Sequence, residues 1–339
     1  MRRFRTGKIP SDILIRSVFR YAGTKDRRVL LGPSIGEDAA LVSLDDQVLV
    51  LSTDPVTGAE SDIGWLSVHL NANDVACRGA KPRWFLCTLL LPEKSNVGVV
   101  ERIMKQIDKA AKELGVAVVG GHTEVTPDLS RPIVIGYMTG TVPKDKFVTS
   151  RGGRPGDHLI MTKAVGIEGT AVLAADFSET LTSKAGARLI QQAKGLRRLI
   201  SVVDDALIAV RAGGVRAMHD PTEGGLLNGT WELAEASRVG FLIHESKIAI
   251  RRETREICSL MQVDPLKLLS SGCLLIAADT RKSGFILRGL SAHGIPAKII
   301  GKLTPRRSGR KLVRVNGSIE EIGPSERDEI YRVIESHRS

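Results

Sequence analysis

A glycine-rich segment, Arg151-Gly-Gly-Arg-Pro-Gly156, separates two stretches in which strand and helix patterns alternate. In the first stretch, Val100–Leu114 carries apolar residues at helical spacing; in the second, Val215–Met218 has the short apolar pattern of a buried strand. Both patterns occur in both stretches, which predicts an α/β or α+β class. A chain of 339 residues is long enough for two domains, and we place them at 1–150 and 151–339.

A helix is expected from near residue 61 to residue 78, with one apolar stripe and Gly79 as its stop signal. Asn71 and Asp74 lie three residues apart and therefore share another face of this helix. An amide and an acid near a helix end, before the strand expected at 84–91, indicate either a polar surface or part of a binding site.

Several expected strands run directly into turns that contain acids. Val48–Ser52 is followed by Thr53-Asp54-Pro55, and Val116–Val119 by Gly120-Gly121-His122-Thr123-Glu124. Carboxylates gathered from several loops suit Mg²⁺, which often bridges to phosphate oxygens. Each turn alone is equally consistent with a simple surface turn, so the pattern predicts no more than a possible Mg²⁺–phosphate site.

Glycine turns before helices add a second signal for phosphate. Gly224-Gly225 precedes a helix expected from Leu226, and backbone N–H groups in such a turn approach phosphate oxygens closely. Gly166 and Gly169 have a similar setting. Neither a Walker loop nor a dinucleotide fingerprint is present in the sequence.

Composition restricts the partners. The net charge of +11 permits phosphate-rich ligands, but aromatic residues make up only 4% and no nucleic-acid motif occurs, which argues against nucleic-acid binding. No apolar run reaches the length of a membrane span, and no apolar segment of a secretory signal follows the basic N-terminus. We expect a cytoplasmic protein. The four cysteines show no zinc spacing.

Taken in order, the motifs resemble the aminoimidazole ribonucleotide synthetase-related (PurM-like) superfamily, and most closely the hydrogenase maturation family HypE. The resemblance spans roughly residues 30 to 303. The motifs that carry it are Gly36-Glu-Asp-Ala-Ala40, Thr53-Asp54, Ala72-Asn-Asp-Val-Ala76, Gly79-Ala-Lys-Pro-Arg83, Gly121-His-Thr123 and Asp220-Pro-Thr-Glu-Gly-Gly225.

The resemblance implies a two-domain PurM-like fold. Its N-terminal domain binds ATP and forms a β-barrel shared by a homodimer, and its C-terminal domain is α/β. It also implies ATP and Mg²⁺ as cofactors, with residues contributed across the dimer. By carry-over, the implied catalytic residues are Asp74 and Asn73, the cofactor-binding residues are Thr53, Gly121, Thr123, Gly224 and Gly225, and the metal ligands are Asp38, Asp54, Asp74, Glu124 and Asp220.

The chain departs from these families at three places. His122 stands where relatives have an acid, and Glu124 is the expected substitute. Glu223 replaces the arginine of a HypE-like Asp-x-Thr-Arg-Gly-Gly motif. HypE carries its substrate group on a C-terminal cysteine, whereas this chain ends Glu335-Ser-His-Arg-Ser339.

Three functional hypotheses follow. The first is a Mg²⁺- and ATP-dependent enzyme that phosphorylates a small molecule or a carbonyl oxygen. Its substrate is either a small molecule or a group carried by a protein. The second is a non-catalytic nucleotide-binding scaffold in hydrogenase cofactor maturation, with a maturation protein as its partner. The third is a small-molecule kinase that resembles thiamine-monophosphate kinase.

Overall fold

The computed structural model describes residues 4, 6–57, 62–325 and 327–336. Contacts divide the chain into two compact units. The first unit consists of Asp26–Gly32 and Asp38–Phe147, and the second of Met1–Lys25, Pro33–Glu37 and Val148–Ser339. These units interleave along the sequence, whereas the division expected from the sequence is a single point between residues 150 and 151.

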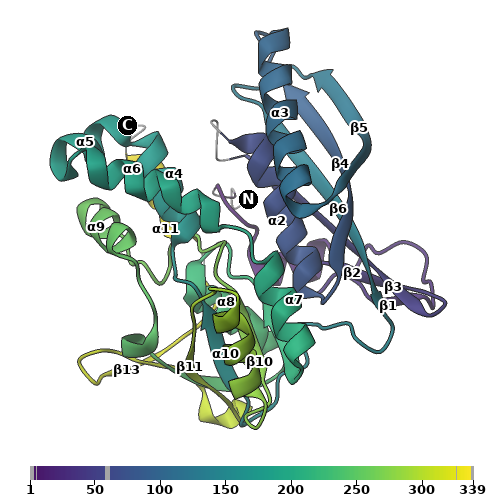
Figure 1. Ribbon diagram of the computed structural model, residues 1–339, viewed down its shortest axis with the longest axis vertical. Coiled ribbons are helices and arrows are strands. Elements are labelled where there is room, and N and C mark those ends of the chain that lie inside the picture. Colours follow the sequence, from purple (N-terminus) through teal and green to yellow (C-terminus); the bar gives the residue numbers. More distant parts are fainter. Residues whose placement is uncertain (1–3, 5, 58–61, 326, 337–339) are drawn as a thin grey trace. The chain divides into compact units, whose positions relative to one another are not determined.

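The first unit is a six-stranded sheet, in the order β1-β2-β3-β6-β4-β5, with two helices packed on one face (Figure 1). Its elements are β1 (Val29–Leu31), β2 (Ala40–Leu44), β3 (Gln47–Val56), α2 (Ile63–Cys77), β4 (Lys81–Leu91), α3 (Val97–Leu114), β5 (Ala117–Val125) and β6 (Ile133–Pro143). The amphipathic pattern predicted α3 correctly: the Asn96 side chain accepts the Val99 N–H at its start, and Gly115 ends it in the left-handed conformation.

Helix α2 is buried on nearly all sides, so the expectation of a single apolar stripe is wrong. It packs against α3, β3 and β6, which surround it within the first unit. Its buried residues include His69, Asn71 and Asp74 as well as the apolar positions. The start expected near residue 61 lies outside the described residues.

Two strands of the first unit are longer than the sequence indicated. β3 continues through Thr53, Asp54 and Pro55, and β5 continues through His122 and Glu124, so these residues lie in strands and not in turns. β5 is also exposed along its whole length, which contradicts the expected burial of its first part. The reason is its position at the end of the sheet, with β4 as its neighbour on one side.

The second unit contains a seven-stranded sheet in the order β13-β12-β9-β11-β7-β10-β8. Its strands are β7 (His158–Thr162), β8 (Val215–His219), β9 (Gly240–His244), β10 (Leu275–Ala278), β11 (Ala297–Thr304), β12 (Arg310–Val313) and β13 (Ile319–Glu321). Its helices are α1 (Ser11–Ser17), α4 (Ile167–Asp176), α5 (Ser178–Ala185), α6 (Ala187–Gly195), α7 (Val203–Ala212), α8 (Gly225–Ala236), α9 (Arg252–Met261), α10 (Ser283–Ala292) and α11 (Glu329–Ser336).

The second unit has two apolar cores. One lies under the sheet and includes Leu159, Phe241 and Leu275. The other joins α4, α5, α6, α9 and α11, which gather in one group of helices in Figure 1, and includes Leu173 and Ile257. Through this second core, the last helix of the chain is held against elements far from it in sequence.

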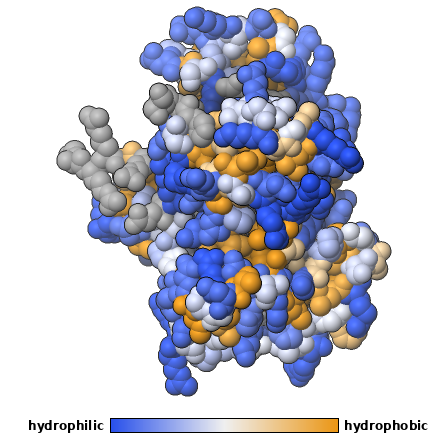
Figure 2. Space-filling view, turned by 90° about the vertical axis from the view of Figure 1, so that its left-hand side faces the viewer, coloured by the Kyte–Doolittle hydropathy of each residue, from blue (hydrophilic) through white to orange (hydrophobic). Residues whose placement is uncertain are grey.

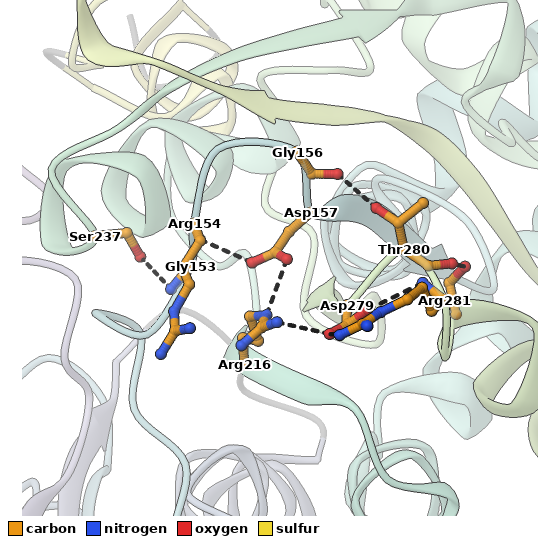
Figure 3. Close-up of polar contacts among 10 residues, drawn as sticks. Gly153, Arg154, Gly156, Asp157, Arg216, Ser237, Asp279, Thr280 and Arg281 are labelled. Carbon is orange, nitrogen blue, oxygen red and sulfur yellow. Dashed lines mark hydrogen bonds and ion pairs between the residues drawn. The ribbon is translucent and has the colours of Figure 1, made fainter.

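The glycine-rich segment at 151–156 is anchored within the second unit (Figure 3). Gly153 N–H donates to the Ser237 hydroxyl at 3.0 Å, and Arg154 N–H donates to the Asp157 carboxylate at 2.8 Å. Arg216 lies between two acids, 3.0 Å from Asp157 Oδ1 and 2.6 Å from Asp279 Oδ2. This paired network fixes the segment that the sequence indicated as a linker.

No helix within the described ranges is both long and apolar enough to cross a membrane. The face drawn in Figure 2 exposes strongly hydrophilic residues together with smaller apolar areas.

Candidate functional site

The first unit places two of the expected acids beside the second half of β3. Asp54 lies in β3 itself, and Asp74 lies in the last turns of α2. The Ser52 hydroxyl donates to Asp74 Oδ2 at 2.5 Å, which joins the helix to the strand two residues before Asp54. Asp74 is buried and Asp54 is exposed, so one carboxylate is held inside while the other faces solvent.

Asn71 holds the backbone of this strand. Its Oδ1 accepts the Asp54 N–H at 2.8 Å, and its Nδ2 donates to the Asp54 carbonyl at 3.2 Å and to the Ser67 carbonyl at 2.9 Å. A Cβ on Gly136 would collide with Asn71 Nδ2 and lie 2.8 Å from Ser67 Oγ. Glycine is therefore required on β6 where α2 crosses it. The sequence singled out Asn71, but it identified neither Gly136 nor the contact of Asn71 with the Asp54 backbone.

Three further candidates lie near these residues in the first unit. Thr53 is exposed, and its hydroxyl donates to the Gly136 carbonyl at 2.9 Å. Asn73 is fully buried in α2. Asp38 precedes β2, and its Oδ2 lies 3.6 Å from Nη2 of Arg78, a fully buried guanidinium. The sequence did not identify Arg78 as a site residue, because an arginine directly after a helix is usually exposed at the surface.

The candidates on β5 are not brought to Asp54 within one chain. Asp54 pairs with Gly136, Gly136 with Cys87, and Cys87 with Gly121, so Asp54 and Gly121 lie in one row across the sheet. They are three strands apart, which is about 14 Å at ordinary strand spacing. Thr123 and Glu124 follow Gly121 along the same exposed strand.

His122 and Glu124 interact on β5. Their Nε2 and Oε2 atoms are 3.0 Å apart, and Thr126 donates to Glu124 Oε1 at 3.1 Å. The hydrogen bond from His122, followed by that from Thr126, lowers the pKa of Glu124. Glu124 is therefore ionised near neutral pH, as a carboxylate ligand must be.

The second unit holds the remaining candidates at the end of β8. Asp220 follows the strand directly and is buried. Gly224 adopts the left-handed conformation before α8, as the glycine turn predicted. Its N–H, however, donates to Asp328 Oδ2 at 2.7 Å, and the Gly225 N–H donates to the Thr222 carbonyl at 3.1 Å. Both backbone donors expected to meet phosphate already have acceptors within this unit.

Buried acids surround this turn. Burial raises the pKa of Asp328 to about 7, although backbone N–H groups oppose the shift. Burial also raises the pKa of Glu168 to about 7, and the charges of Asp328, Glu223 and Asp220 add to the effect. The sequence gave no signal for Asp328 or Glu168, since neither lies in a motif.

The oxygen donors of the first unit fit Mg²⁺ by their chemistry, because Asp38, Asp54 and Asp74 offer carboxylate oxygens and no sulfur or imidazole. Asp54 and Asp74 lie on the regular elements β3 and α2, whereas Asp38 lies in the segment before β2. The roles of the individual residues remain predictions.

Comparisons with known proteins agree with this architecture. The family models for the N-terminal and C-terminal domains of AIR synthase related proteins match residues 36–142 and 154–313. A Methanocaldococcus jannaschii protein, named provisionally for hydrogenase expression and formation, is 31% identical over 80% of this chain and 81% of its own. The carbamoyl dehydratase HypE of Rhodobacter capsulatus is 28% identical over 91% of this chain and 89% of its own.

Solved structures share the fold. The matching chain of a HypE–HypF complex has a TM-score of 0.75 at 24% identity, covering 92% of this chain and 99% of that chain. HypE in complex with ATP has a TM-score of 0.70 at 23% identity, covering 96% and 98%. The expected two-domain PurM-like α/β fold is confirmed, and the chain belongs to the AIR synthase related family.

Proposed function

We propose that this chain is a Mg²⁺- and ATP-dependent, HypE-like enzyme of hydrogenase maturation. It phosphorylates a carbonyl oxygen or a small molecule. When the acceptor is a carbonyl oxygen, that oxygen can then leave the substrate as part of phosphate. Support comes from relatives named carbamoyl dehydratase HypE and from the shared fold with a HypE that was crystallised with ATP.

The observation that carries this proposal is the junction of β3 and α2. The Ser52 hydroxyl ties Asp74 to the strand, and Asn71 fixes the Asp54 backbone through two hydrogen bonds. Acids on a strand and a helix are held more firmly than acids on loops. Phosphoryl transfer depends on such positioning and on charge neutralisation more than on a special nucleophile.

In this proposal, Asp38, Asp54 and Asp74 would hold Mg²⁺, which would neutralise the charge of the polyphosphate. Asn71 and Ser52 orient the acids, and Thr53 is exposed beside Asp54 for contact with a phosphate oxygen. The buried guanidinium of Arg78 lies 3.6 Å from Asp38 and places a positive charge beside that carboxylate.

We further propose a homodimer in which β5 supplies residues to the site of the partner. Gly121, Thr123 and Glu124 lie too far from Asp54 to act on it within one chain, and their strand is an exposed edge. The exposed apolar side chains of Val118, Val119 and Val125 favour an edge that is covered in the assembled protein. ATP binding and dimerisation would then both belong to residues 1–150.

The test is calorimetric titration with a non-hydrolysable ATP analogue, with and without Mg²⁺. We expect binding that requires Mg²⁺ and is lost in the Asp54→Asn and Asp74→Asn variants. Asp108→Asn, which removes an equal charge from the exposed face of α3, should bind like the wild type. Full Mg²⁺-dependent affinity in both site variants would contradict the assigned ligands.

The turn at Gly224 and Gly225 favours a second candidate function. In it, the protein is a scaffold that binds a nucleotide and a maturation protein but does not hydrolyse the nucleotide. The Gly224 N–H is occupied by Asp328, so the turn does not present this donor to a phosphate. Tight nucleotide binding with no phosphate release, even with a HypF-type partner and carbamoyl donors supplied, would support the scaffold. Phosphate release that depends on a substrate would support the enzyme.

A further inference from the structure

A cavity of about 280 Å³ lies among helices α5, α6 and α9 of the second unit, which form one group in Figure 1. Its apolar lining consists of Ala185, the last residue of α5, and Leu189, which is buried in α6. Its polar lining consists of Arg188 and Gln192 of α6 and Arg252, the first residue of α9. No acid is among these lining residues, so two guanidinium groups from different helices share one space with no carboxylate in its wall.

The two arginines have little within the chain to balance their charge. Among the residues that the structure describes, the Arg188 side chain forms no hydrogen bond or ion pair. Arg252 Nε lies 3.9 Å from Glu256 Oε1, and the Arg252 side chain is 81% exposed. Glu253, the acid in the first turn of α9, lies 3.6 Å from Nε of Arg251 instead. Exposed pairs at such distances contribute little energy, so both guanidinium groups of the cavity are available to a ligand.

Other cations of the second unit have carboxylates close to them, as Lys8 shows. Its Nζ lies 3.2 Å from Glu232 Oε1. Glu223 Oε2 accepts the Lys8 backbone N–H at 2.7 Å, and Glu223 Oε1 accepts the Tyr331 hydroxyl at 2.8 Å, which joins the first and last segments of the chain. Carboxylates thus neutralise this cation inside the unit, whereas the arginines of the cavity are left for an external anion.

The starts of two helices add to the positive potential at the cavity. Arg188 lies in the first turn of α6 and Arg252 begins α9, and no side-chain hydrogen bond caps either helix. The N–H groups at the start of a helix carry partial positive charge, which repels a cation and favours an anion nearby. An anion bound between the two arginines would relieve this repulsion.

We propose that this cavity binds a phosphate monoester that carries a small apolar group. Such an ester has a charge of about −1.5 to −2 near pH 7, which balances two guanidinium groups better than a single carboxylate does. Each guanidinium can donate two parallel N–H bonds to phosphate oxygens. Ala185 and Leu189 offer an apolar surface to the rest of the ligand. Pockets for drug-sized ligands measure about 300–1,000 Å³, so a ligand that fits here is smaller.

This proposal does not depend on the proposed function. All residues that line the cavity belong to the second unit, whereas Asp38, Asp54 and Asp74 belong to the first. Because a nucleotide site also accepts phosphate groups, the experiment must show where the ester binds.

Calorimetric titration of the full chain with phenyl phosphate, in the presence of Mg²⁺ and saturating non-hydrolysable ATP analogue, tests the proposal. We expect millimolar or tighter binding, and weaker binding of inorganic phosphate, which lacks the apolar group. Arg188→Ala and Arg252→Ala should each weaken phenyl phosphate binding about tenfold, because each removes a charge-assisted contact. Arg188→Lys keeps the charge without the planar fork and should be intermediate. Arg211→Ala removes an equal charge from an exposed position on α7 and should bind like the wild type.

Arginine modification by phenylglyoxal locates the bound ester independently of affinity. Mass spectrometry of proteolytic peptides should show that phenyl phosphate protects Arg188 and Arg252 and leaves Arg211 reactive. Both cavity arginines are exposed, so their variants should fold, and Arg188→Gln repeats the test if Arg188→Ala does not.

Three results would overturn the proposal. The first is a wild type that binds no phenyl phosphate at millimolar concentration. The second is equal affinity in the wild type, Arg188→Ala and Arg252→Ala, which would place the ester elsewhere on the protein. The third is inorganic phosphate binding as tightly as phenyl phosphate, which would exclude the apolar part of the ligand. None of these results bears on ATP binding, which the titration with the analogue alone decides.

Discussion

The side-chain amide of Asn71 bonds both backbone groups of Asp54: its Oδ1 accepts the N–H at 2.8 Å, and its Nδ2 donates to the carbonyl at 3.2 Å. Asn71→Ala leaves both groups without this partner, and we expect the free energy of unfolding to fall by about 1–3 kcal/mol. Mg²⁺-dependent binding of the ATP analogue should weaken as well. Chemical denaturation and calorimetry measure the two effects. Asn71→Asp, which keeps the acceptor for Asp54, should be the milder variant, and unchanged affinity in Asn71→Ala would show that Asp54 does not need this support.

Gly136→Ala should disturb the same junction from the side of β6. The added methyl would collide with Asn71 Nδ2, and that side chain cannot move without breaking its bonds to Asp54. We expect a loss of about 1–3 kcal/mol in unfolding free energy, as for other overpacked sites. Gly32→Ala is the control in the same unit, since its methyl would meet only Val29 at 3.7 Å. Equal thermal midpoints for the two variants would contradict the tight crossing of α2 over β6.

The buried carboxyl of Glu168 makes the stability of the second unit depend on pH. Its pKa is raised from 4.5 to about 7, so between these values the folded protein holds the proton more tightly than the unfolded chain. The stabilisation is complete below the lower value and is lost as the pH rises toward 7. Glu168→Gln should therefore gain stability relative to the wild type as the pH rises, by up to about 3 kcal/mol.

Denaturant unfolding from about pH 5 to about pH 8 measures that difference. The exposed Glu179→Gln is the matched control and should follow the wild type across the range. A constant difference between Glu168→Gln and the wild type would mean that Glu168 ionises in the fold as readily as in the unfolded chain.

The edge strand β5 gives a prediction for the proposed dimer. Val119 is 53% exposed on this strand, and a lysine there should oppose pairing with a second copy. We expect Val119→Lys to shift the protein from dimer to monomer in light scattering coupled to size-exclusion chromatography. Val97→Lys, at an exposed valine on α3, should leave the mass unchanged. A dimer that persists in Val119→Lys at low protein concentration would place the interface elsewhere.

The sequence predicted those elements well whose pattern is local, and it predicted poorly those whose extent depends on neighbouring strands. Helix α3 was predicted well because its amphipathic spacing and its stop at Gly115 agree, and the structure adds a cap at Asn96. β3 was expected to end at Ser52, because the Asp54-Pro55 pair that follows is typical of a turn. In the structure β2 pairs with β3 only as far as Leu51, so the proline lies where that side of β3 is unpaired and its missing N–H costs little.

The sequence identified the candidate acids because they follow apolar runs, but it did not predict which residues surround them. Burial of α2 on nearly all sides depends on contacts with β3 and β6, which a single helical pattern does not record. The apolar start of β5 looked like a buried strand, although it lies at an exposed edge. Asn71, Arg78 and Asp328 act through partners distant in sequence, and a pattern read along one chain does not reveal such pairs.

The hydrogen bonds of Glu223 to Lys8 and Tyr331 also affect the order in which the chain can fold during synthesis. The first unit ends at Phe147, so all of its strands are synthesised before the first strand of the second unit, which starts at His158. Lys8 belongs to the second unit, and its neighbour on α11 is more than three hundred residues away. The segment around Lys8 precedes the first unit in the sequence, yet it can make these contacts only after Tyr331 has been synthesised.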